Sequence, residues 1–194
     1  MEIHLIRHGK TAENEKKLYC GQANPPLSEE GETEVMALRD QGLYPPAPDF
    51  CVVSGLIRAG LTLSLIYGAV GRTVIPGLME YDFGLFELKS HEELENEQEY
   101  QAWIQDTSGD VLCPQGESKN MFQARVAEAF DTLLSEATER ACHSVAAVIH
   151  GGVIASIMES LFPDTRNFYE WQPAYGRGYT LIYENEALQG YQKI

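Results

Sequence analysis

The chain has 194 residues, enough for one domain, and its 14 Lys and Arg against 29 Asp and Glu give a net charge of -15. A chain this acidic repels nucleic acids and anionic membranes over most of its surface, so we expect neither as a partner. The hydrophobic share of 44% is typical of a soluble protein with a core of useful size.

The four cysteines are scattered, and no C-x-x-C pair occurs among them. A chain of this size needs no disulfides, and the spacing predicts no zinc site, so free thiols in a reducing compartment are expected. The first residues, MEIHLIRHGK, lack a basic leader followed by a long apolar run. No apolar stretch reaches the roughly 18 residues of a membrane span. The sequence therefore predicts a cytoplasmic protein.

The predicted elements alternate between strands and helices. Strands are expected at residues 3–6, 51–54, 73–75, 145–149 and, as the last, 179–183. Helices are expected at residues 28–41, 57–67, 90–106, 117–137 and 151–161. Ser28 can cap the first helix, and the spacing from Ser90 to Glu93 is that of a capping box.

This alternation is typical of a mostly parallel, doubly wound sheet that is covered by helices on both faces. We therefore predict an α/β fold, a three-layer αβα sandwich that forms a single domain over residues 1–194. Residues 80–116 contain helix but no clear strand. We expect this stretch to form a small helical lobe inserted over the end of the sheet that carries the functional site.

Two of the predicted strands end in the same way, with a histidine followed by glycine. HLIRHG spans residues 4–9, and AAVIHGG spans residues 146–152. Ligands bind beyond the carboxyl ends of the strands in doubly wound sheets, so His8 and His150 are expected at one site. The glycines allow tight turns, and the N–H groups that open each following helix suit an anion.

Arginines accompany these histidines. Arg7 precedes His8, and Arg58 opens the helix after the second strand. The guanidinium group offers a planar fork of donors that matches phosphate oxygens. A neutral imidazole can attack phosphorus, and fixed cations stabilise the transferring group. Glu80, in LMEYDFG, is the candidate general acid for the leaving alkoxide, provided that the pocket keeps its carboxyl protonated.

These motifs resemble a known family. LIRHGKTAEN resembles the signature of the histidine phosphatase superfamily, in its phosphoglycerate mutase-like branch. Five further blocks resemble that family in the same order, namely YCGQANPPLSEEG, SGLIRAGLT, LMEYDFGLFE, PQGES and VIHGG. The first of these five also resembles the α-ribazole phosphatases of the branch, but it is shared too widely to settle the substrate.

The resemblance spans residues 3 to about 184 and implies a phosphatase that needs no cofactor or metal. It implies that His8 is phosphorylated and that Glu80 acts first as the acid and then as the base that activates water. Asp82 and Glu87 are the alternatives to Glu80. The phosphate pocket implied by the resemblance is completed by Arg7, Asn14, Gly21, Arg58, His150 and the N–H of Gly151.

Three positions depart from the family pattern. Lys10 stands where Glu or Gln is more frequent, Asn24 where Asp is common, and Leu88 where Gly is usual. None of them removes a catalytic group. Lys10 is expected to add positive charge near the mouth of the site, and Arg177 is a further candidate for substrate contact.

Four functions compete at this point. The main prediction is a phosphomonoesterase that acts on a small phosphorylated metabolite. The first alternative is a cofactor-dependent mutase, disfavoured by the short segment between Arg58 and Glu80. The second is an inactive phosphate-binding protein, which the intact set of site residues argues against. The third is a metallohydrolase, disfavoured because two arginines would repel a divalent cation. The natural substrate, the pathway and a homodimeric state stay open.

Overall fold

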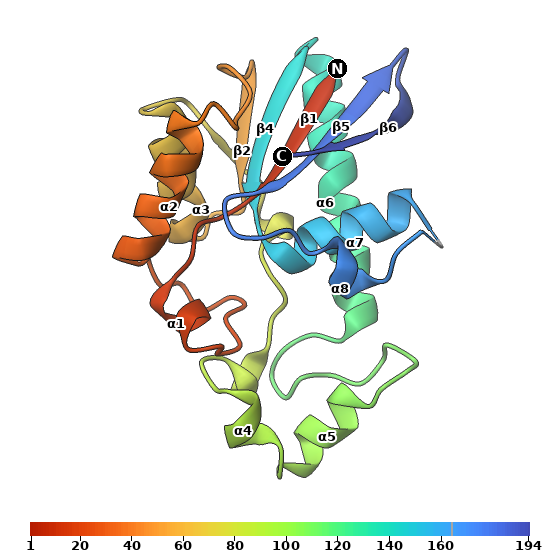
Figure 1. The fold of residues 1–194 in the computed structure, drawn as a ribbon. Helices are drawn as coiled ribbons and strands as arrows, with labels where there is room; N and C mark the ends of the chain where they lie inside the picture. The colour runs from red at the N-terminus through yellow and green to blue at the C-terminus, as the bar shows by residue number, and fades with distance from the viewer. Residues whose placement is uncertain (164) are drawn as a thin grey trace.

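The computed structural model describes residues 1–163 and 165–194 and shows a six-stranded sheet with helices around it (Figure 1). The strands are β1 (Glu2–Arg7), β2 (Phe50–Val53), β3 (Thr73–Val74), β4 (Ser144–Ile149), β5 (Gly178–Glu184) and β6 (Ala187–Lys193). Their order across the sheet is β3-β2-β4-β1-β5-β6. The first four strands pair in parallel, whereas β5 and β6 are antiparallel, so the predicted mostly parallel α/β sheet is confirmed.

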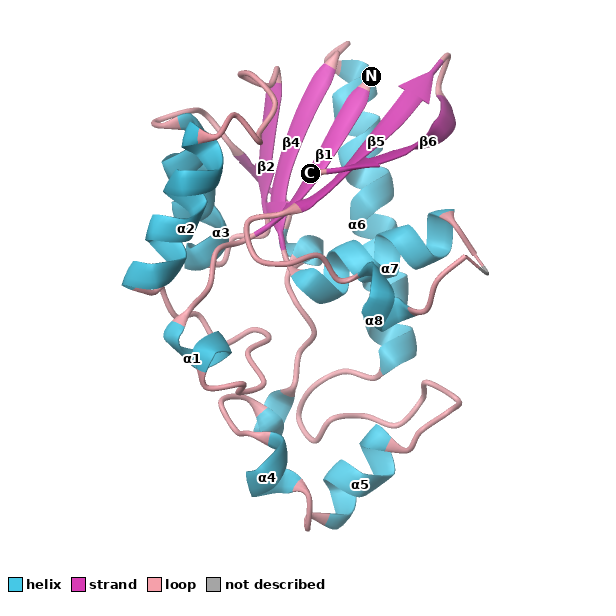
Figure 2. Ribbon diagram, in the orientation of Figure 1, coloured by secondary structure: helices cyan, strands magenta, loops and turns pink. Residues whose placement is uncertain are grey.

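The helices are distributed along the whole chain (Figure 2). They are α1 (Ala12–Glu15), α2 (Glu29–Asp40), α3 (Ile57–Tyr67), α4 (His91–Leu94), α5 (Gln98–Ile104), α6 (Lys119–Glu139), α7 (Gly151–Leu161) and α8 (Phe168–Trp171), with the 3-10 turns η1 (Pro76–Leu78) and η2 (Gly84–Phe86). Ser28 caps α2 as predicted, because its side chain accepts the N–H of Gly31.

The central strand β1 is buried on both faces and contributes to two cores. Ile3 and Leu5 pack into a core with residues of α6 and α7. Ile6 packs into a second core with residues of α2 and α3. Figure 1 accordingly draws α2 and α3 on one side of the sheet and α6 and α7 on the other. A strand covered by helices on both faces is what a three-layer αβα sandwich requires.

Two local predictions are wrong. Residues 90–106 form two helices, since α4 ends at Leu94 and the extended backbone of Glu97 starts α5. The strand near 179–183 is not the last, because β6 follows and pairs with β5. Asn185 and Glu186 join the two strands, both with positive φ, at 49° and 64°. Such a two-residue turn suits the right-handed twist of a hairpin.

The carboxyl end of β1 faces the part of the chain that holds α1, α4 and α5 (Figure 1). Among the described residues, the stretch 80–116 contains η2, α4 and α5 and no strand. Its interior is aromatic, and Phe86 and Tyr100 are fully buried there. The division of the chain into a sheet and an inserted lobe over the site stays a prediction.

Candidate active site

His8 follows β1 at the carboxyl end of the sheet and is buried. Its Nδ1 lies 2.6 Å from the carbonyl oxygen of Gly9, so Nδ1 carries the ring proton and donates it. Nε2 therefore has a free lone pair, which accepts Arg58 Nε–H at 3.2 Å. Burial and then the charge of Arg58 hold the pKa of His8 well below its ordinary value. The imidazole is thus neutral at neutral pH.

His150 follows β4 and is fully buried, with its ring centroid 5.0 Å from that of His8. Its Nε2 lies 2.7 Å from Ser54 Oγ. That oxygen also accepts the N–H of Leu56 at 3.3 Å, and its own proton has no other acceptor among the described residues, so we assign that proton to the bond with His150. Nδ1 of His150 then carries the ring proton, and within the described residues this buried atom has no hydrogen-bond partner. Burial and then Arg58 lower the pKa of His150 as well.

Arg58 lies in the first turn of α3, and its side chain is fully buried. Its Nη1 donates to the carbonyl of Ala23 at 2.7 Å, and its Nη2 donates to the carbonyl of Gly21 at 2.6 Å. Burial lowers the pKa of Arg58, and the neighbouring Glu80 and Glu87 oppose that shift. The guanidinium is thus held between His8 and the loop of residues 21–23.

Arg7 reaches the same place from the end of β1. Its Nη1 donates to the carbonyl of Pro173 at 2.7 Å, and its guanidinium carbon lies 3.8 Å from the centroid of the Tyr175 ring. Its Nε is buried and finds no partner in the part of the chain that the structure describes. A Cβ on Gly151 would lie 2.8 Å from the guanidinium carbon, so glycine lets the Arg7 side chain lie against the start of α7.

Glu80 lies between η1 and η2 and meets the start of α7. Its Oε2 accepts the N–H of Gly152 at 2.8 Å, and its Oε1 accepts the N–H of Tyr81 at 2.9 Å. A Cβ on Gly152 would lie 2.3 Å from Oε1, so this contact also needs glycine. The carboxylate therefore binds the N-terminus of α7, at an N–H group two residues beyond His150.

The alternative acids Asp82 and Glu87 are engaged with backbone. Asp82 accepts the N–H two residues further along the chain at 3.0 Å. Glu87 accepts the N–H groups of residues 21, 22 and 23 at 3.0, 2.7 and 3.3 Å. The N–H of Gly21 is therefore donated to Glu87, whereas its carbonyl accepts from Arg58. Glu87 holds this loop, and Glu80 is the carboxylate at the His150 helix.

Two other predicted positions, Asn14 and Lys10, follow His8 closely along the chain. Asn14 belongs to α1, where its Oδ1 accepts the N–H of Thr11 at 3.1 Å in a capping box. Lys10 donates to Glu34 at 2.8 Å and to Glu30 at 3.2 Å, and these bonds raise its pKa. The two carboxylates of α2 offset the positive charge that we expected Lys10 to add.

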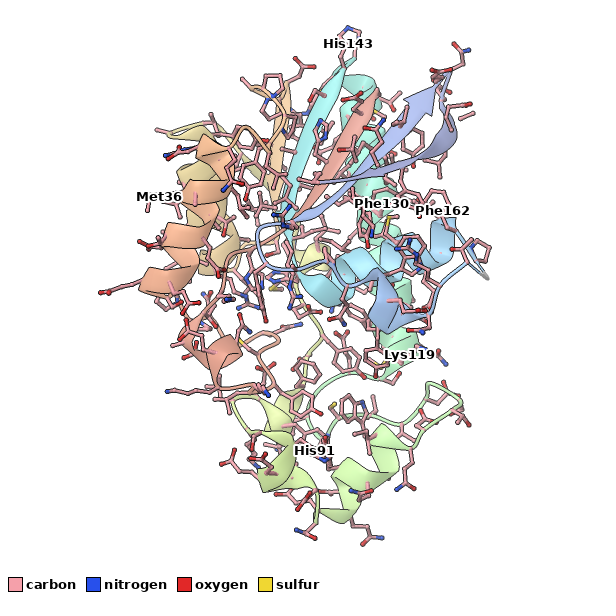
Figure 3. All side chains as sticks on the ribbon, in the orientation of Figure 1. Met36, His91, Lys119, Phe130, His143 and Phe162 are labelled. Atoms are coloured by element: carbon pink, nitrogen blue, oxygen red, sulfur yellow. The ribbon has the colours of Figure 1, made fainter. Side chains whose placement is uncertain are left out.

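Arg177 has an exposed side chain and takes part through its backbone, because its carbonyl accepts the N–H of Arg7 at 2.8 Å. His91 and His143 lie away from the carboxyl ends of the strands. Figure 3 shows His91, the first residue of α4, and His143, which precedes β4, at opposite ends of the molecule.

The sequence pattern did not point to three residues of the site, namely Ser54, Thr62 and Tyr175. Thr62 Oγ1 accepts the N–H of Gly9 at 3.0 Å and so holds the turn after the first histidine. Tyr175 covers Arg7, and its ring centroid lies 5.9 Å from that of His8. Ser54 directly follows β2, so the rule that pointed to His8 and His150 would also have found Ser54.

The sequence matches one family over nearly its whole length. Residues 3–189 match the histidine phosphatase superfamily (branch 1). The chain belongs to this family. The family and the enzyme class that the RHG and HGG motifs predicted are therefore confirmed.

Relatives of this histidine phosphatase are named after two activities. It is 32% identical over 165 residues to the adenosylcobalamin/α-ribazole phosphatase of Salmonella typhimurium, covering 83% of this chain and 79% of the relative. It is 35% identical over 174 residues to a 2,3-bisphosphoglycerate-dependent phosphoglycerate mutase of Nitrobacter hamburgensis, covering 82% of each. The crystal structure of the α-ribazole phosphatase from Shigella flexneri superposes with a TM-score of 0.85 at 28% identity, covering 97% of this chain and 93% of that one.

Residues 1–163 and 165–194 also bear on the predictions about metals and membranes. No three His, Cys, Asp or Glu side chains are grouped there so that they could hold a metal ion. No helix in these ranges is both long enough and apolar enough to cross a membrane.

Proposed function

We propose that this histidine phosphatase hydrolyses the phosphate monoester of a small metabolite through a phosphohistidine on His8. The observation that supports this most is the pair of buried donors without a partner in the described residues, Arg7 Nε and His150 Nδ1. The ring of His150 lies next to that of His8, whose Nε2 carries no proton, and Arg7 lies over Tyr175, whose ring centroid is 5.9 Å from that of His8. A phosphoryl group would accept both N–H groups and present its phosphorus to that lone pair.

The first step is a displacement at phosphorus. The Nε2 lone pair of His8 forms the P–N bond while the ester P–O bond breaks, and the leaving oxygen takes a proton from Glu80. Arg58 Nε–H donates to the same lone pair in the structure, so a phosphate oxygen must first take over that N–H. Arg58 would then bind the phosphoryl group and release the nucleophile together.

The second step returns the enzyme to its starting state. Water attacks phosphorus, Glu80 accepts its proton, and the P–N bond breaks to give phosphate and neutral His8. Both oxygens of Glu80 accept backbone N–H groups in the structure. These bonds hold the carboxyl of Glu80 beside the N-terminus of α7.

The alternative function is a mutase, which the 35% identity to the Nitrobacter enzyme favours. A mutase hands the phosphoryl group back to a second hydroxyl of an anionic substrate and must hold that anion in place. Lys10, the cation that distinguishes the rim of this site, is bonded to Glu30 and Glu34. The phosphatase is therefore the better supported reading.

We propose activity without a metal ion or other cofactor, because Arg7 and Arg58 already supply the positive charge that a divalent cation would bring. The four cysteines are free thiols, which suits the cytoplasmic location that we propose.

The test is turnover of a panel of phosphorylated metabolites in excess EDTA. Release of inorganic phosphate in EDTA, with inhibition by vanadate, is expected. Loss of turnover in EDTA that one divalent ion restores would point to a metallohydrolase. Recovery of the phosphoryl group on a second hydroxyl of the substrate, rather than as phosphate, would establish the mutase.

A further inference from the structure

A partly buried ion pair between Arg125 of α6 and Glu117 contacts the loop that carries Glu80. We propose that Arg125 and Glu117 are positioning residues, which fix the backbone on both sides of Glu80 and so aim its carboxyl at the leaving group. This inference rests on the proposed function of Glu80 as the general acid.

Arg125 grips the residues up to and including Glu80. Its Nη1 donates to the carbonyls of Gly77 and Met79, each at 2.8 Å. Its Nη2 donates to the carbonyl of Glu80 itself at 3.3 Å. One guanidinium thus donates to three backbone carbonyls within residues 77–80, a pattern that a planar fork of donors allows.

Glu117 grips the residues after Glu80. Its Oε1 accepts the N–H of Asp82 at 2.8 Å, and its own N–H donates to the carbonyl of Asp82 at 3.0 Å. Its carbonyl accepts the hydroxyl of Tyr81 at 2.8 Å. The carboxylate also binds Arg125, through Nε at 3.2 Å and through Nη2. Each half of the pair therefore holds one side of the acid.

The backbone of residues 79–83 lies outside any helix or strand, so it has no regular hydrogen-bond ladder of its own. The ion pair supplies those bonds instead, and Glu117 is only 7% exposed. Geometry matters here because proton transfer needs the acid within hydrogen-bond reach of the leaving oxygen. A displacement of about 1 Å can cost on the order of 10²-fold in rate.

A positioning role and a purely structural role predict different results. If the pair aims the acid, its loss slows the reaction only where the acid is needed, with poor leaving groups such as a sugar hydroxyl. If the pair only supports the fold, its loss slows all substrates alike. The informative quantity is therefore the ratio of phosphorylation rates with an alkyl phosphate and with nitrophenyl phosphate.

The experiment measures single-turnover phosphorylation of His8 by both substrates in the whole protein. Arg125→Lys keeps the charge opposite Glu117 but cannot donate to three carbonyls and a carboxylate at once. We expect the alkyl rate to fall at least about 10-fold and the nitrophenyl rate to stay within about 3-fold. Glu117→Gln, which keeps the shape of the side chain, should behave in the same way.

Arg140→Gln is the matched control, because Arg140 directly follows α6 and forms a surface pair with Glu136 of that helix. Neither rate should change in that variant. Glu80→Gln is the reference and should lower the alkyl rate by about 10²–10⁴-fold and the nitrophenyl rate far less. Adding Arg125→Lys to Glu80→Gln should lower the ratio no further, because the two residues act through one proton transfer.

The outcomes separate the two claims. In one outcome, Glu80→Gln slows mainly the alkyl substrate, but Arg125→Lys and Glu117→Gln slow both substrates alike or slow neither. The positioning role is then wrong, and the role of Glu80 as the acid is retained. If Glu80→Gln itself slows both substrates alike, Glu80 is not the acid and the inference falls with it. Phosphorylation of His8 in the wild-type protein tests the proposed phosphatase independently of either result.

Discussion

His8 and His150 follow two neighbouring parallel strands and precede the same residue, glycine, yet they offer opposite groups to the site. Both rings carry their proton on Nδ1, as their partners indicate. The Nδ1–H of His8 is bonded to the carbonyl of Gly9, and its Nε2 lone pair faces the site. The Nε2 lone pair of His150 is bonded to Ser54, and its Nδ1–H is left to face the site. One tautomer in two orientations thus yields a nucleophile and a donor.

The difference teaches that the role of a histidine is set by the partner of its other nitrogen. In the first strand end that partner is backbone, which any residue at position 9 would supply. For His150, the partner is the side chain of Ser54, which follows β2 and reaches the ring only because the fold places β2 beside β4. Three changes test this difference between the two rings. They remove the donor His150, its partner Ser54, or the neutral state of both rings.

The largest effect is expected from removing the donor. His150→Ala should lower turnover by about 10²–10³-fold, as the loss of one transition-state donor usually does. His150→Asn should recover part of this loss, because the asparagine amide nitrogen lies close to where the Nδ1 donor was. Steady-state kinetics of the two variants check this.

The same pair of substitutions at His8 is the control. Neither His8→Ala nor His8→Asn should retain turnover, since an amide has no nucleophilic lone pair. Rescue by Asn at position 8, or its failure at position 150, would contradict the roles assigned to the two rings.

A smaller effect is expected from removing the partner. Ser54→Ala should slow turnover about 10-fold, because it leaves the Nε2 of His150 buried without a proton donor and frees the ring to change tautomer. Nitrogen NMR of histidine-labelled protein should show the proton on Nδ1 of His150 in the wild type and a shift toward Nε2 in the variant.

Ser144→Ala is the matched control, because Ser144 Oγ lies 3.2 Å from Nε2 of another buried histidine, His4, at the far end of the sheet. It should leave turnover unchanged. Equal losses in the two serine variants would mean that the effect is one of stability alone.

The smallest effect concerns stability. Burial and Arg58 depress the pKa of His8 and of His150 below 6.5, so the folded state keeps both rings neutral where the unfolded chain takes up protons. Stability is thus complete above pH 6.5 and is lost as the pH falls toward the folded-state values, by up to about 1.4 kcal/mol per pH unit for each ring.

Denaturant unfolding at pH 7.5 and 5.5 in a phosphate-free buffer measures this loss. His8→Asn should flatten the dependence, because it removes one of the two rings that must stay neutral. An unchanged slope in that variant would show that His8 is already protonated in the folded protein.

The sequence predicted the site residues that lie beside predicted elements or within recognisable motifs. His8, Arg7, Arg58 and His150 lie at the ends of elements that hydrophobic patterning locates, whereas Glu80 was found through its motif, LMEYDFG. The structure brings these residues together. Tyr175 could not be found in this way, because it lies in a loop 168 residues from Arg7 and reaches it only through the return of the chain to β5.

The fold was predictable where the pattern was long. The strand β6 was missed because its residues, ALQGYQK, are mostly exposed at the edge of the sheet and carry little apolar signal. The helix expected over 90–106 was too long because the pattern of residues 91–104 stays helical across the break at Glu97. The contacts of Lys10 with α2 depend on tertiary structure. The sequence therefore could not show that Glu30 and Glu34 offset the charge of Lys10.

The most direct test of the central claim is the position of the phosphate in enzyme quenched during turnover. With labelled substrate, an acid-labile and base-stable phosphate is expected on His8, bonded through Nε2, since Nδ1 is held by the carbonyl of Gly9. Alkaline digestion followed by separation of the two phosphohistidine isomers identifies the nitrogen, and loss of the label in His8→Asn identifies the residue. Label on His150, label on Nδ1 of His8, or full turnover without any labelled histidine would contradict the opposite roles of the two rings.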